Sequence, residues 1–107
     1  MKALTVTAMK KLEIIVEGEH QGFVVDLLNR AGVAGYTVFH NLSGKGSHGI
    51  HTGQLMFNDE SVLVMLISAV PENLVEPILE GLTPFFNKHM GLVFTSDIQV
   101  GRIGQNA

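Results

Sequence analysis

Apolar and polar residues along this chain follow two successive spacings, one typical of strands and one typical of helices. Between Lys11 and Glu17 apolar residues take every second position, which predicts a half-buried strand. From Glu19 to Ala31 they recur every three or four residues, which predicts an amphipathic helix. Gly32 follows and is a typical C-terminal stop. The chain is therefore expected to begin with a strand and a helix.

Three more strands and a second helix are expected in the rest of the chain. One strand is predicted at about 35–42, and the almost wholly apolar Ser61–Val70 is predicted to be a strand covered on both faces. Pro71 is expected as the first residue of the second helix. Pro77 lies inside that helical pattern and predicts a kink or an irregular first turn. Alternation over Leu92–Val100 predicts the last strand.

This order of elements, βαββαβ, is that of an α+β ferredoxin-like subunit. We expect one domain over residues 1–107, in which residues 1–9 are an N-terminal extension, either an extra edge strand or a loose tail. Two helices cover one face of a four-stranded sheet, and the apolar Ile15 and Val93 suggest that another subunit covers the other face. The composition, 46 % hydrophobic and only 16 % charged, supports the same expectation.

Several functions are disfavoured by composition. A net charge of −3 without a basic run gives nucleic acid little to bind. The absence of cysteine excludes disulfides, thiolate metal sites and cysteine nucleophiles. We see neither a signal peptide nor an apolar run long enough to insert into a membrane, so a cytoplasmic protein is expected. No arrangement typical of catalysis is present, so we expect no enzyme.

The segment 43–59, between the second and third strands, is rich in glycine and lacks periodicity, which is typical of a functional, mobile loop. Its first half offers backbone amides, an ammonium, a hydroxyl and an imidazole that together favour an anion. These groups come from Gly44, Lys45, Gly46, Ser47 and His48. The spacing is not that of a Walker motif. A flexible glycine-rich hairpin is the alternative interpretation.

Several of these segments resemble those of the PII and PII-like signal transduction proteins. The run Ala31–Val38, which closes the first helix and opens the second strand, is similar to the signature of that family. Gly44–Gly46 resembles the start of the family's T-loop, and Pro71-Glu72 resembles the junction before its second helix. Gly91 and the strand after it resemble the exit from its B-loop. The resemblance runs from about residue 10 to residue 102.

The resemblance implies a homotrimer with an adenine nucleotide in each cleft between neighbouring subunits. The nucleotide would be bound at the start of the second strand, at the base of the T-loop, after the B-loop and by one arginine near the C-terminus. By position these residues are Gly35, Tyr36, Thr37, Gly44, Lys45, Gly46, Gly91, Leu92 and Arg102. Movement of the loop 43–59 would then control a partner protein.

The chain also departs from the family pattern. Members that bind ATP have lysines where this chain has Met65 and Leu92, and its B-loop is shortened to 87–90. ADP or AMP is therefore expected in preference to ATP. Tyr36 is the only tyrosine and lies outside the loop, so uridylylation is not expected.

These departures resemble the divergent branch associated with carboxysomes and bicarbonate transport. Bicarbonate is then a second effector, bound by Ser47 and His48. A membrane transporter or a carboxysome-related protein is the expected partner.

Two alternatives remain at this point. His48 and His51, with His40 nearby, could bind a transition metal, as in the CutA type of trimeric ferredoxin-like protein. The nucleotide-binding hypothesis expects no metal. The second alternative is an apolar structural subunit that caps a larger complex.

Overall fold

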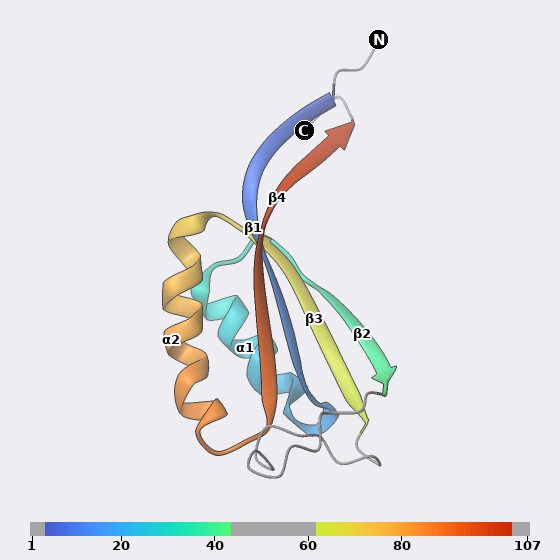
Figure 1. Ribbon diagram of the computed structural model, residues 1–107, viewed down its shortest axis with the longest axis vertical. Helices are drawn as coiled ribbons and strands as arrows, with labels where there is room; N and C mark the ends of the chain where they lie inside the picture. Colours follow the sequence, from blue (N-terminus) through green and yellow to red (C-terminus); the bar gives the residue numbers. More distant parts are fainter. Residues whose placement is uncertain (1–3, 44–61, 104–107) are drawn as a thin grey trace.

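A computed structural model describes residues 4–43 and 62–103 of the chain (Figure 1). Within these ranges the elements follow the predicted βαββαβ order, and the fold is the α+β, ferredoxin-like one. The strands and helices are β1 (Leu4–Glu17), α1 (Gln21–Ala31), β2 (Thr37–Leu42), β3 (Leu63–Val70), α2 (Val75–Phe86) and β4 (Gly91–Ile103). Short 3₁₀ turns, η1 (Gly18–His20) and η3 (Glu72–Leu74), lead into the two helices.

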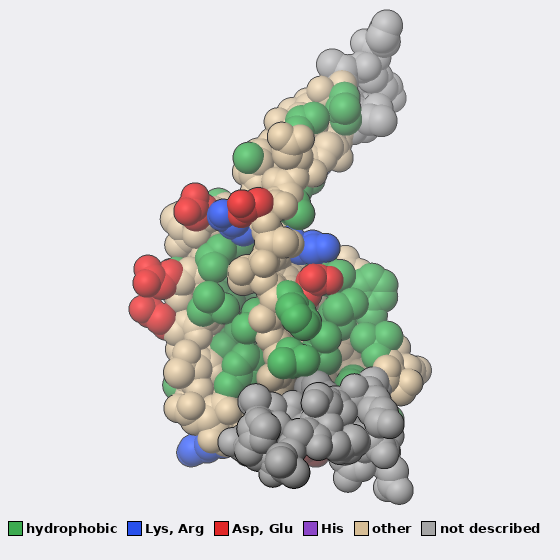
Figure 2. Space-filling model, viewed as in Figure 1, with side chains coloured by type: hydrophobic (Ala, Val, Ile, Leu, Met, Phe, Trp, Pro, Cys, Tyr) green, Lys and Arg blue, Asp and Glu red, His purple; other side chains and the backbone are tan. Residues whose placement is uncertain are grey.

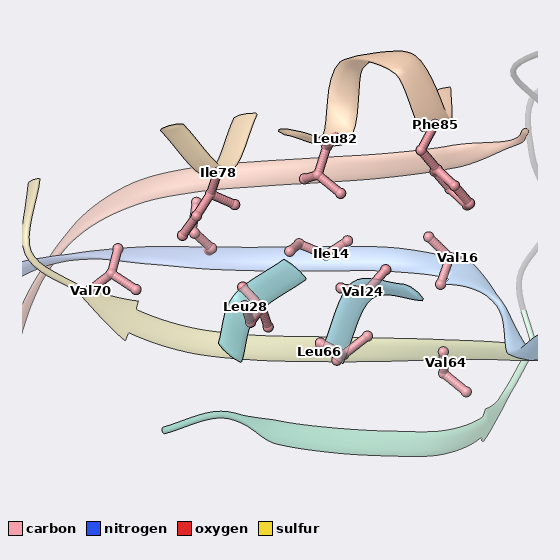
Figure 3. Packing of buried hydrophobic residues seen from close by; sticks show 11 residues of the cluster. Ile14, Val16, Val24, Leu28, Val64, Leu66, Val70, Ile78, Leu82 and Phe85 are labelled. Atoms are coloured by element: carbon pink, nitrogen blue, oxygen red, sulfur yellow. The ribbon is translucent and has the colours of Figure 1, made fainter. Parts of the chain in front are cut away.

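The four strands form one antiparallel sheet in the order β2-β3-β1-β4, and both helices pack on the same face of it (Figure 1). From Leu12 to Val16 of β1 and from Val64 to Val70 of β3, every second residue points toward the helices and is buried (Figure 3). The helices contribute the remaining apolar side chains of this core, among them Val24, Leu28, Ile78 and Leu82. None of the helices in the described ranges is long and apolar enough to cross a lipid bilayer.

The predicted end of α1 is confirmed, whereas the predicted first residue of the second helix is not. Gly32 ends α1 with φ 85°, a left-handed conformation that costs glycine little, which confirms it as the stop. Pro71 is extended and precedes η3, so its predicted place as the first helical residue is wrong. Pro77 lies in the first turn of α2, where a backbone N–H has no acceptor within the helix, and the predicted irregular start is the turn η3.

β1 and β4 are longer than the hydrophobic pattern predicted. Leu4–Met9 is neither a separate edge strand nor a loose tail, because it continues β1 and pairs with Ile98–Ile103 of β4. The two segments form a ribbon that projects beyond the helices (Figure 1). Residues 4–8 of this ribbon are exposed, and the exposed fractions of Leu4 and Val6 are 59 % and 49 %. Leu4 and Val6 alternate with Thr5 and Thr7, which is typical of a strand, but the alternation did not show that this segment continues β1.

The register of β4 corrects the face predicted for Val93. Val93 pairs with Ile14 and packs against the core under the helices, whereas Leu92 pairs with Ile15 on the opposite, open face. Phe94 also lies on the open face and is 50 % exposed. β3 is buried on its helix side, whereas Met65, Ile67 and Ala69 on the open side are only half-buried, so the prediction that both its faces are covered does not hold for the single chain.

Candidate functional site

The segment expected to contact adenine lies between α1 and β2. Gly35 and Tyr36 precede the strand, Thr37 begins it, and all three residues are exposed. A Cβ added to Gly35 would meet no atom within 4 Å. The backbone therefore has open space beside it, which a ligand can approach.

A hydrogen bond from Ser68 of β3 holds this segment in place. Ser68 lies on the helix side of β3, is only 3 % exposed, and its Oγ donates a hydrogen bond of 2.6 Å to the carbonyl oxygen of Gly35. Among the described residues, Ser68 is the only polar residue that is buried. Sequence reasoning missed it because it stands within an almost wholly apolar run. A lone hydroxyl within such a run was the signal that could have revealed it, since a buried hydroxyl needs a partner.

Gly91 and Leu92, expected near the phosphates, begin β4 directly after the short turn 87–90. A Cβ on Gly91 would overlap the ring of Phe86, so close packing against that ring already requires glycine at this position. The turn itself is tight, because the N–H groups of Lys88 and His89 both donate to the carbonyl oxygen of Phe85, at 3.0 and 2.9 Å.

Leu92 and Thr37 lie on strands at opposite edges of the sheet. Phe39, Met65, Ile15 and Leu92 form a row of paired positions across all four strands. Three strand spacings separate the ends of this row, about 14 Å. Within one chain the adenine segment on β2 and the start of β4 are therefore not neighbours.

Arg102 lies farther still from the start of β4. It pairs with Thr5 in the projecting ribbon and is exposed. Eleven residue-to-residue steps along the extended strand lead from Gly91 to Arg102, a distance of about 36 Å. One chain therefore cannot bring Arg102 and Gly91 to the same phosphate group.

The remaining expected site residues lie outside the described residues. They are Gly44, Lys45, Gly46, Ser47 and His48, and His51 of the metal alternative lies outside them too. Just before them the pairing of β2 is interrupted by a bulge. Asn41 in this bulge has a φ of 59°, which asparagine tolerates better than most residues. The ring of His40 lies 3.0 Å from Oε1 of Gln21, which ties β2 to the start of α1.

A hollow of about 520 Å³ lies where the ribbon leaves the body of the molecule. Its walls include Lys10 and Asp97, whose side chains form a salt bridge across β1 and β4. The hydrogen bond that Lys10 donates to Asp97 raises the pKa of Lys10 above its ordinary value, against a smaller opposing effect of desolvation. Charged side chains of both signs gather at this junction (Figure 2). The sequence pattern gave no indication of this pair, which is 87 residues apart.

The open face of the sheet carries apolar side chains on both edge strands. The exposed fractions are 43 % for Phe39, 38 % for Leu92 and 50 % for Phe94. Hydrophobic side chains are visible over the strands beside α2 in Figure 2. A face of this kind on a small domain is typical of an interface between subunits.

The chain is similar to one protein family both in sequence and in structure. The model of the family described as nitrogen regulatory protein P-II matches residues 9–105. The apo form of CPII from Thiomonas intermedia K12, a nitrogen regulatory PII-like protein, is 56 % identical, with a TM-score of 0.81 over 94 % of this chain and 99 % of that chain. None of the curated proteins matches this chain.

Two further structures of CPII from the same organism contain ligands. The one bound to ADP, AMP and acetate is 58 % identical, with a TM-score of 0.80 over 92 % of this chain and 93 % of that chain. The one bound to ADP, AMP and bicarbonate is 57 % identical, with a TM-score of 0.77 over 92 % and 98 %. The comparisons give no support to the alternative of a CutA-type metal-binding protein.

Proposed function

This chain belongs to the nitrogen regulatory protein P-II family, and from that premise we propose that it is a non-catalytic, trimeric sensor that binds ADP or AMP between its subunits. The observation that carries this proposal is the structure of CPII, 57 % identical to this chain, bound to ADP, AMP and bicarbonate. The whole chain, residues 1–107, acts as a single domain in this proposal.

The separation of the expected site residues supports a cleft between subunits. Thr37 lies on one edge strand, Gly91 begins the other, and Arg102 is about 36 Å along β4 from Gly91. One nucleotide reaches all of them only if different subunits supply them. The apolar open face, with Phe39 and Phe94, supplies a surface on which three subunits can pack.

The preference for ADP or AMP follows from the row that crosses the open face. Met65 and Leu92 stand where ATP-binding relatives have lysines, and Ile15 lies between them. The row therefore offers no cation to a phosphate. A triphosphate has the most charge to neutralise and loses most from the absence of two charge-assisted hydrogen bonds.

Bicarbonate is the proposed second effector, with Ser47 and His48 as its ligands. The support is the bicarbonate found with CPII and the donors that these side chains and the glycine amides would offer to an oxyanion. In this proposal ligand binding at the base of the loop 43–59 offsets the entropy of ordering it and so changes its affinity for a partner. A transporter or carboxysome-related protein in the cytoplasm is the proposed partner.

Alanine substitutions of the two expected phosphate-binding cations test the nucleotide site. Lys45→Ala and Arg102→Ala should each weaken ADP binding by roughly tenfold or more, since each removes a charge-assisted hydrogen bond. Arg30→Ala is the matched control, because Arg30 lies on α1 and its side chain donates to the carbonyl oxygen of Asp26. Binding is measured by calorimetry. Unchanged ADP affinity in both variants would refute the assigned phosphate site.

A further inference from the structure

The expected phosphate site has few cations within the body of the molecule. The row across the open face presents Met65, Ile15 and Leu92, which are uncharged. Arg102 lies in the projecting ribbon, about 36 Å along β4 from its start, and Lys45 lies outside the described residues. A diphosphate at the start of β4 therefore needs a further positive group.

The turn 87–90, directly before β4, offers such a group. Lys88 is exposed and stands three positions before Gly91. We propose that Lys88 binds the terminal phosphate of ADP, in place of the lysines that the row lacks. This assignment rests on the proposed nucleotide site and adds one residue to it.

The ammonium group of Lys88 is free to bind an anion, whereas most other basic side chains of the described residues are already bonded. Lys10 and Lys11 form salt bridges with carboxylates of β4 and β1, and Arg30 donates to a backbone carbonyl oxygen. Within the described ranges, the side chain of Lys88 forms neither a salt bridge nor a hydrogen bond. Arg102 is the other unbonded cation there, and it lies in the ribbon.

The turn that carries Lys88 is fixed by the helix before it. The N–H groups of Lys88 and His89 donate to the carbonyl oxygen of Phe85, at 3.0 and 2.9 Å. The ring of His89 also lies against the buried ring of Phe85, with centroids 4.8 Å apart. On the side of β4, the ring of Phe86 leaves room only for glycine at Gly91. The flexible stem of the lysine therefore extends from a fixed backbone beside the start of β4.

The chemistry of the lysine suits a phosphate group. An ammonium is a compact charge with three donors, and its hydrogen bonds to phosphate oxygens are charge-assisted. Lys88 replaces one of the two missing cations and not both, which agrees with the proposed preference for ADP over ATP. A lysine after the end of a helix can instead serve only the helix dipole, and that role would change stability without changing nucleotide affinity.

Calorimetric titration of full-length Lys88→Ala with ADP and with AMP tests the assignment. ADP affinity should fall roughly tenfold, because a charge-assisted hydrogen bond is lost, and AMP affinity should fall less. Lys88→Arg should keep most of the ADP affinity. Arg30→Ala is the control, since it removes a cation from α1 and should leave both affinities unchanged. Lys88 is exposed, so its variants are expected to fold, which circular dichroism checks.

The dependence of ADP affinity on salt gives a second readout. Added sodium chloride should weaken ADP binding more steeply in the parent than in Lys88→Ala, because the parent has one more charge to screen. The assignment is overturned if Lys88→Ala binds ADP like the parent, or if its ADP and AMP affinities fall by the same factor. If Lys45→Ala and Arg102→Ala weaken ADP binding while Lys88→Ala does not, the nucleotide site stands without Lys88. A parent protein that binds neither nucleotide would overturn the proposed function itself and this assignment with it.

Discussion

The hydroxyl of Ser68 donates a hydrogen bond of 2.6 Å to the carbonyl oxygen of Gly35. This bond links the interior of β3 to the exposed segment that leads into β2. Ser68 faces the helices in register with Leu12 of β1, so its position is set by the core. Through this bond the core determines where Gly35 and Thr37 are presented at the edge of the sheet.

Ser68→Ala should therefore affect both stability and nucleotide binding. Loss of the bond should lower the free energy of unfolding by about 1 kcal/mol and weaken ADP binding severalfold, because the Gly35 segment is no longer fixed. Thr83→Ala is the control, since Thr83 bonds Leu79 within α2, on the exposed side. Urea unfolding and calorimetry measure the two effects. A lower free energy of unfolding together with unchanged ADP affinity would contradict the link to the nucleotide site and leave Ser68 with a purely structural role.

Gly91→Ala should destabilise the fold by about 1–3 kcal/mol, because the new methyl group would collide with the rigid ring of Phe86. Gly22→Ala should instead raise the free energy of unfolding. A Cβ at Gly22 meets no atom within 4 Å, and alanine in α1 restricts the unfolded chain, so a gain of about 0.5 kcal/mol is expected. Thermal and urea unfolding of the two variants test this contrast. Equal effects of the same sign would contradict the packing argument for Gly91.

Phe94→Lys should disrupt the proposed trimer while leaving each subunit folded. Phe94 is 50 % exposed in the single chain, so lysine is tolerated there, but it would bury a charge in the proposed interface. Phe23→Lys is the comparison, because Phe23 is 39 % exposed and lies on α1 in the helix layer. Analytical ultracentrifugation should give a monomer for the first variant and a trimer for the second. A trimeric Phe94→Lys protein would mean that the open face is not the interface.

The salt bridge between Lys10 and Asp97 should make stability depend on pH in the alkaline range. The folded-state pKa of Lys10 is raised above 10.5, chiefly by its hydrogen bond with Asp97. Its stabilising effect is therefore fully present below pH 10.5 and is lost as the pH rises through the raised value. Urea unfolding of the parent and Lys10→Met should differ at neutral pH and converge at high pH. A constant difference across this range would show that the charge of Lys10 contributes nothing.

Much of the fold was predictable because its signals are local. Alternation located the second half of β1 and most of β4. The left-handed conformation that ends α1 at Gly32 is one that glycine favours. What failed depends on partners distant in sequence. The alternation of Leu4 and Val6 did not show that their segment continues β1. Val93 and its neighbours are all apolar, so only the register with β1 assigns their faces.

The candidate site was less predictable for the same reason. Gly35 and Gly91 were singled out as glycines that a ligand approaches, yet the sequence did not show that Ser68 fixes one and Phe86 excludes a side chain at the other. Contacts of this kind join segments that are far apart along the chain. The residues of the loop 43–59 expected to bind the phosphates and bicarbonate remain predictions.

The central claim is that this protein is a nucleotide sensor modulated by bicarbonate, and calorimetric titration with ADP, AMP and ATP tests it most directly. Each nucleotide is titrated with and without bicarbonate, with chloride at equal ionic strength as the control. We expect ADP and AMP to bind more tightly than ATP and bicarbonate to change their affinity. Absence of binding by all three nucleotides, with and without bicarbonate, would contradict the account.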